Sequence, residues 1–180
     1  MEKYNKQKAI LTALLKWVET EFFGIFVFLF FIAVAKPFGA LANIIFGLTG
    51  LLTVVCLMAD FGLKQGEEAR NKVTFHGEND CPNYGFTLGL IASIPCYITM
   101  ILLMISKISG SFMPAYKLLD ACFYPLIDWA AHSADVKDMS PFVFIMTAIF
   151  PLLYPFATWI GFKISYKQID VKERVVYKHK

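Results

Sequence analysis

Four side chains that could bind a metal ion lie between residues 120 and 135: Asp120, Asp128, His132 and Asp135. On a helix, His132 follows Asp128 by four residues and precedes Asp135 by three, so these groups share a face and could hold a divalent cation. One histidine with flexible carboxylates is a poor ligand set, and ion pairs on a solvated helix face explain the same spacing. We therefore treat Asp128, His132 and Asp135 as candidate metal ligands, but predict neither a metal nor another cofactor.

The segment 115–131, which carries two of these carboxylates, is too apolar for a simple connecting loop. Polar residues occur at every fourth position, and the last of them lies one residue beyond the segment. They form a stripe of Asp120, Tyr124, Asp128 and His132. This pattern predicts an amphipathic helix that is interfacial or re-entrant, with Pro125 limiting its regularity. We expect the stripe to face water or a vestibule, because burying an unpaired carboxylate is costly.

Established catalytic patterns are missing from the sequence. It contains no HExxH, no GxSxG and no phosphate-binding loop. We expect Glu19 and Glu21 at the headgroup level, which leaves no acidic residue, histidine or lysine deep in a predicted span. Four cysteines occur without a CxxC pair, and Cys96 is interpreted as a small apolar residue. These observations argue against an enzyme without excluding one.

The composition predicts that membrane helices position the candidate polar residues described above. Hydrophobic residues make up 57% of the 180, charged residues only 17%, and the mean hydropathy is +0.56. Such a composition excludes a disordered chain and disfavours an ordinary soluble domain. Long stretches without Asp, Glu, Lys or Arg predict four spans, at about 17–35, 38–58, 86–106 and 141–162. The expected fold is all-α: one membrane domain, a four-transmembrane-helix bundle, with the amphipathic segment between helices 3 and 4.

Lysine and arginine predict the orientation of these spans. With both termini on the same side, thirteen Lys and Arg residues lie on that side and four on the other. The positive-inside rule then predicts a multi-pass protein of the cell membrane with both termini cytoplasmic. The basic tail, 163–180, should meet anionic lipid headgroups. The net charge of +3 gives no indication of nucleic-acid binding.

Small residues and prolines mark the faces along which the spans should pack. They occur in the second, third and fourth spans: Gly39, Asn43 and Gly47; Gly85, Gly89 and Ser93; and Pro151 and Pro155. Small residues at helical spacing let helix backbones approach closely, so Gly89 should touch another helix. The prolines are expected to produce structural kinks, although broken helices also coordinate substrates in transporters.

Three functions remain open. The leading expectation is a small integral membrane subunit or accessory protein, without catalysis, that assembles with itself or with a membrane-protein partner in the lipid bilayer. The alternative is an oligomeric channel or transporter for an ion or small molecule. A membrane-embedded enzyme is the third.

Overall fold

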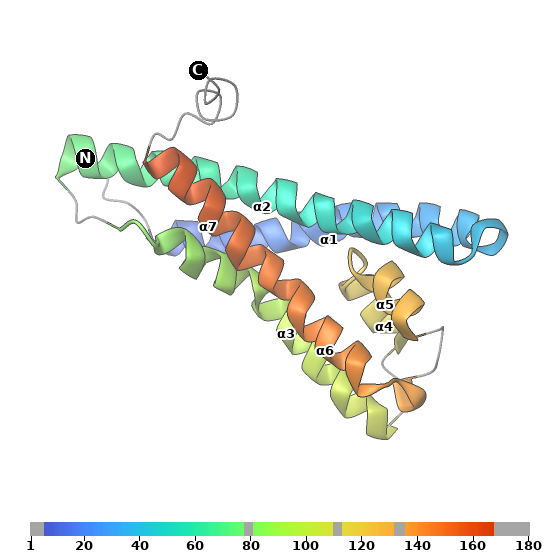
Figure 1. Ribbon diagram of the computed structural model, residues 1–180. Helices are drawn as coiled ribbons and strands as arrows, with labels where there is room; N and C mark the ends of the chain where they lie inside the picture. Colours follow the sequence, from blue (N-terminus) through green and yellow to red (C-terminus); the bar gives the residue numbers. More distant parts are fainter. Residues whose placement is uncertain (1–5, 78–80, 110–112, 132–135, 168–180) are drawn as a thin grey trace, which may run out of the picture.

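The protein was analysed as a computed structural model, which describes residues 6–77, 81–109, 113–131 and 136–167. Every regular element in these residues is helical (Figure 1). In chain order they are α1 (Lys6–Phe38), α2 (Ala40–His76), α3 (Tyr84–Ser109), α4 (Met113–Leu119), α5 (Tyr124–Ala131), η1 (Val136–Asp138), α6 (Pro141–Ile149), η2 (Phe150–Leu152) and α7 (Leu153–Tyr166).

Four helical stretches are long and apolar enough to cross a membrane, at 6–34, 40–75, 84–107 and 141–166. This confirms the predicted class of fold, an all-helical membrane bundle with four spans. The helices are longer than the predicted spans, because α1 and α2 continue through charged turns at one end of the bundle. The fourth span comprises α6, η2 and α7.

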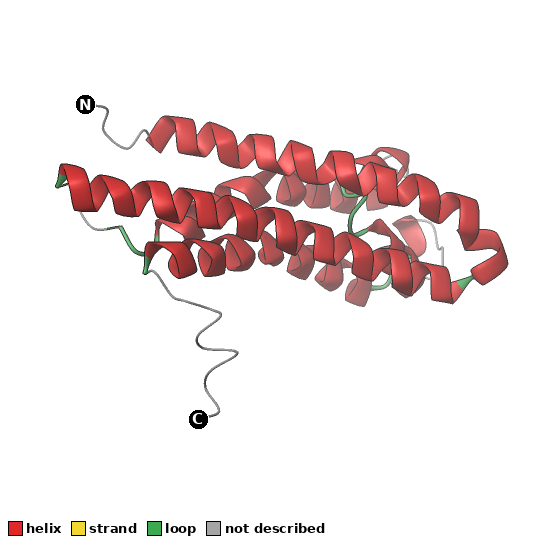
Figure 2. Ribbon diagram, turned by 90° about the horizontal axis from the view of Figure 1, so that it is seen from above, coloured by secondary structure: helices red, strands yellow, loops and turns green. Residues whose placement is uncertain are grey.

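The spans form a wedge rather than a parallel bundle. Helices α1 and α2 lie side by side as an antiparallel hairpin, and α3 runs beside α6 and α7 (Figures 1 and 2). The α1–α2 turn is made by Gly39, whose φ of 49° suits a residue without Cβ. At the opposite end, the Lys6 ammonium lies 6.0 Å from the Tyr84 ring centroid, so α1 and α3 begin together. The two helix pairs diverge from that end toward the α1–α2 turn.

Glycines set the close contact of α7 with α2 and α3. A Cβ on Gly161 would lie 2.2 Å from the Ala59 carbonyl oxygen of α2, and one on Gly62 would lie 2.2 Å from the Thr158 carbonyl oxygen. On α3, a Cβ on Gly89 would lie 2.4 Å from the Pro155 Cα. The prediction that Gly89 touches another helix is therefore confirmed, and at these three glycines α7 is held by contact with backbone atoms.

Helices α4 and α5 fill the open part of the wedge (Figure 1). They form a hairpin whose tip, residues 120–123, is closed by backbone hydrogen bonds, including Phe123 N–H to the Asp120 carbonyl at 3.0 Å. The tip enters the bundle because two glycines make room. A Cβ on Gly50 would lie 2.0 Å from the Cys122 carbonyl oxygen, and one on Gly24 would lie 2.6 Å from the Cys122 Sγ. The amphipathic segment is thus a re-entrant hairpin, not a single helix lying on a surface.

The fourth span bends at its prolines. Pro151 lies in the short 3₁₀ segment η2, and Pro155 lies in the first turns of α7. Proline lacks the N–H that would close an α-helical turn, which accounts for the change of helix type. The Thr158 hydroxyl donates to the Tyr154 carbonyl at 2.8 Å, and both residues are buried. The prolines therefore shape a kink and help to place the Tyr154 side chain.

Candidate functional site

A buried carboxylate lies near the middle of α1. Glu21 is only 5% exposed, although the sequence placed it among headgroups. Its Oε2 accepts the Ala121 N–H at 3.2 Å, and its Oε1 accepts the Tyr154 hydroxyl at 3.4 Å. The sequence expectation was wrong because α1 begins about eleven residues before the predicted span, which carries Glu21 into the bundle.

A second buried carboxylate comes from the tip of the re-entrant hairpin. Asp120 is 2% exposed, so it points into the bundle and not toward water as expected. The Thr99 hydroxyl of α3 lies within hydrogen-bonding distance both of Asp120 Oδ2 and of the Cys96 carbonyl oxygen. One hydroxyl has one proton to donate. Both bonds are therefore made when Thr99 donates to the Cys96 carbonyl and a protonated Asp120 donates to Thr99.

Cys96 completes this group. It is 1% exposed and lies at the midpoint of α3, as Tyr154 lies at the midpoint of the fourth span. One ligand atom from each of Glu21, Cys96 and Asp120 lies within 4.8 Å of the others. We call these three residues the carboxylate cluster. It joins α1, α3 and the hairpin tip in the middle of the membrane-spanning bundle.

No basic side chain among the described residues neutralises the two carboxyl groups of the carboxylate cluster. Among the described residues, neither Glu21 nor Asp120 forms an ion pair with a lysine, arginine or histidine. Asp120 lies outside the four spanning stretches, and burial raises its pKa to about 7, opposed by hydrogen bonds with Thr99 and Cys96. Two buried carboxyl groups this close cannot both ionise without a cation, so the cluster holds a proton or another positive ion.

The remaining polar residues of the stripe form a separate contact on the hairpin. Tyr124 donates to Asp128 Oδ1 at 2.8 Å, and the Asn43 amide of α2 donates to Asp128 Oδ2 at 3.3 Å. The Lys117 ammonium lies 5.0 Å from the Tyr124 ring centroid. Tyr124 is 4% exposed, so this part of the stripe also faces inward. His132 and Asp135 lie outside the described residues, and Asp128 is bound by the hairpin and α2.

The other residues chosen from the sequence are packing residues in this fold. A Cβ on Gly47 would meet the Leu126 side chain at 2.3 Å, and one on Gly85 would meet the Phe162 side chain at 2.3 Å. Ser93 is 1% exposed and donates to the Leu90 carbonyl at 2.8 Å. A Cβ on Gly39 would have no neighbour within 4 Å. None of these four contributes a titratable group.

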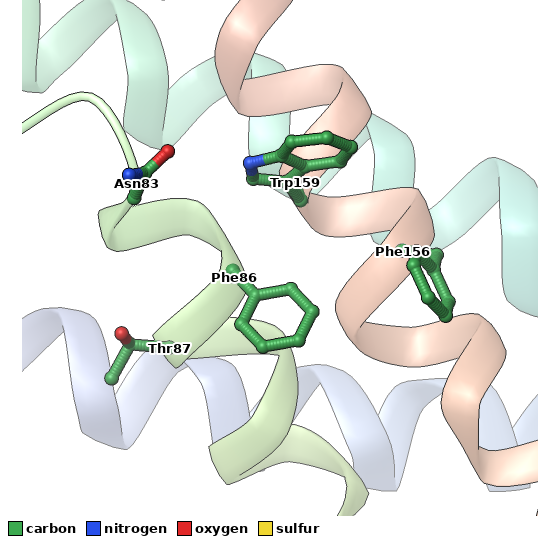
Figure 3. A pocket seen from close by; sticks show the side chains of 5 residues that line it. All are labelled: Asn83, Phe86, Thr87, Phe156 and Trp159. Atoms are coloured by element: carbon green, nitrogen blue, oxygen red, sulfur yellow. The ribbon is translucent and has the colours of Figure 1, made fainter.

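An apolar groove lies on the outer surface, away from the carboxylate cluster. It has a volume of about 330 Å³ and separates the first turns of α3 from α7 (Figure 3). Phe86 and Phe156 face each other across it at 6.2 Å between ring centroids, with Trp159 alongside (Figure 3). Asn83 and Thr87 complete the described lining. None of these five lining residues is an acid or a base, so the groove does not compete with the carboxylate cluster as a site of chemistry.

The sequence reasoning missed Glu21 and Cys96. The sequence held one signal for Glu21, which immediately precedes the uncharged stretch 22–35. Glu21 also follows Glu19 by two residues, so on a helix the two carboxylates point in different directions. Glu19 pairs with Lys16 and is half-exposed, whereas Glu21 turns inward. No local signal connects Cys96 with residues that lie 75 positions before it or 24 after it.

The fold and the carboxylate cluster together define a class: a helical membrane protein with four spans and an ionisable site inside the bundle. Comparison with known proteins adds no narrower identity. No protein-family description, curated protein or solved structure matches the chain.

Proposed function

We propose that the protein is an integral membrane transport component that binds a cation in exchange for a proton at the carboxylate cluster. The observation that carries this proposal is the pairing of Glu21 with Asp120, both buried, without a basic partner among the described residues. Ionisable groups inside a membrane bundle are costly and usually mark ion pathways or proton relays. A passive accessory subunit, the leading expectation from the sequence, gives no reason to retain two such groups.

The position of the pair supports the same function. Glu21, Cys96 and Tyr154 each lie near the middle of a spanning stretch, the depth at which secondary transporters hold their coupling ions. The tip of the re-entrant hairpin completes the site, where non-helical backbone supplies the Ala121 N–H to Glu21. Irregular backbone at membrane depth is tolerated where it is buried in protein or lines a cavity.

Ion-coupled proton movement tests the function. In proteoliposomes with an internal pH-sensitive dye, adding Na⁺, K⁺, Mg²⁺, Mn²⁺ or Zn²⁺ outside should make the interior more alkaline for at least one cation. Glu21→Gln and Asp120→Asn should each lower the rate at which the internal pH rises at least tenfold, because an amide side chain does not ionise and cannot take up or release a proton at the site. Glu19→Gln is the matched control: Glu19 lies two residues away, paired with Lys16 at the surface, and the rate should be unchanged. A wild-type protein that moves protons with none of these cations, or a fully active Glu21→Gln variant, would contradict the proposal.

We also propose that both termini are cytoplasmic and that the protein lies in the cell membrane, on the charge asymmetry of the sequence. Lys167→Cys and Ser140→Cys place single probes at exposed positions at opposite ends of the bundle. The background replaces Cys56 and Cys81 and keeps the buried Cys96 and Cys122. In intact cells a membrane-impermeant maleimide should label the Ser140→Cys chain and leave the Lys167→Cys chain unlabelled until the cells are opened. The reverse pattern would invert the orientation.

A further inference from the structure

We infer that the carboxylate cluster is a site for a divalent transition metal of the zinc class, bound by Glu21, Cys96 and Asp120. This inference rests on the proposed function and names the cation that the site would take. The three ligand atoms lie within 4.8 Å of one another. Donor atoms around a tetrahedral Zn²⁺ are roughly 3.3–3.7 Å apart, given Zn–O and Zn–S bonds of about 2.1 and 2.3 Å. Metal binding would draw the three donors to that spacing.

The chemistry of the donors selects among cations. Two carboxylates and a thiolate suit Zn²⁺ and its neighbours in the transition series. Ca²⁺ and Mg²⁺ require six or more oxygen ligands, often including several waters, and a thiolate is a poor ligand for either. The buried position of all three residues excludes the bulk water that would complete such a shell. The thiol is therefore the selective element of the cluster.

A second observation is a buried N–H without a hydrogen-bond partner beside the cluster. Among the described side chains, the Trp17 indole nitrogen is the one fully buried nitrogen or oxygen atom without a hydrogen-bond partner. Trp17 lies one helical turn before Glu21 in α1, and its side chain interacts with that of Cys96. The sulfur of a thiol is a weak acceptor, whereas a thiolate accepts an N–H strongly. The indole N–H would therefore gain a strong acceptor if Cys96 bound a metal as a thiolate.

The surroundings are organised to support the bound state. The Ala121 N–H and the Tyr154 hydroxyl hold Glu21. The Thr99 hydroxyl would turn its one proton from the Cys96 carbonyl to an ionised Asp120, so each carboxylate has a partner on another element. Such outer hydrogen bonds fix ligand geometry in metal sites. With three anionic ligands, the metal complex carries one net negative charge, which these donors and the Trp17 N–H offset. Binding releases protons, because a metal is bound by the deprotonated forms of the thiol and the carboxyl groups.

Cobalt binding to the purified full-length protein in detergent, with any affinity tag removed, tests the site directly. Addition of Co²⁺ should produce thiolate-to-metal charge-transfer absorption in the near ultraviolet, and Zn²⁺ should abolish it by displacement while Mg²⁺ does not. Cys96→Ser should remove the absorption and weaken Zn²⁺ binding at least tenfold. The matched control is Cys56→Ser, because Cys56 is exposed on α2 and its loss should leave both readouts unchanged. Asp120→Asn should also weaken Zn²⁺ binding at least tenfold.

The outcomes separate this inference from the proposed function. Absorption that persists in Cys96→Ser, or equal affinity for Zn²⁺ and Mg²⁺, overturns the metal assignment. If proton movement in proteoliposomes depends on Glu21 but is driven by Na⁺, K⁺ or Mg²⁺ and is unaffected by Cys96→Ser, the transport function stands and the metal assignment fails. If Co²⁺ binds through Cys96 but no cation moves protons, the metal site stands and the transport function fails. Circular dichroism of each variant shows that it is folded before binding is compared.

Discussion

Replacing Gly50 by alanine should expel the re-entrant hairpin from the bundle. The added Cβ would lie 2.0 Å from the Cys122 carbonyl oxygen and 2.9 Å from its carbonyl carbon, and backbone atoms cannot rotate aside. Overpacking typically costs about 1–3 kcal/mol, and a clash with backbone belongs at or above the upper end. We expect a lower midpoint of thermal unfolding in detergent. We also expect rapid maleimide labelling of Cys122, which is fully buried in the wild type.

Gly47→Ala is the matched comparison, because the same helix meets the hairpin one turn earlier through a side chain. Its added Cβ would meet Leu126 Cγ at 2.3 Å, and a leucine can change rotamer. The loss of stability should therefore be smaller than for Gly50→Ala, with Cys122 still protected from labelling. Equal stability of the Gly50→Ala chain and the wild type would show that the hairpin does not insert at this depth.

Stability should depend on pH through Asp120. Its pKa is raised from 3.8 to about 7 by burial, so the folded state binds the proton more tightly than the unfolded state. Between these two values the folded chain carries more protons than the unfolded chain, and the free energy of unfolding falls as pH rises. The stability that this proton contributes is present at pH 4 and is lost as the pH rises to about 7.

Asp120→Asn should remove that part of the pH dependence, because the amide keeps a hydrogen-bonding group beside Thr99 but does not titrate. The groups that face Asp120 are Glu21 of α1, Cys96 of α3, Tyr116 of α4 and Tyr154 of α7. They are kept in this variant, and because Glu21 and Asp120 titrate as a coupled pair, the difference in slope belongs to that pair. Asp138→Asn, an exposed position, should leave the slope as in the wild type. The measurement is the midpoint of thermal unfolding at pH 5, 6, 7 and 8, and parallel curves for wild type and Asp120→Asn would refute the assignment.

The sequence by itself determined the class of protein and the four spans. Crossing a membrane depends on the length and apolar content of a continuous stretch, which are local properties that can be read without a partner. The same reasoning located Gly89 at a helix contact, since a row of small residues signals close approach whichever helix fills it. It also identified 115–131 as an amphipathic segment between the third and fourth spans.

Only the tertiary structure decided what the polar face of that segment meets. A stripe of polar residues has the same pattern whether it faces water or a polar interior, so Asp120 was assigned to water and lies instead beside Thr99 and Cys96. Whether Glu21 lay at the surface or inside depended on where α1 begins and on a hairpin tip 100 residues later. The carboxylate cluster exists because glycines on α1 and α2 let that tip enter the wedge, a long-range steric condition that no local pattern encodes.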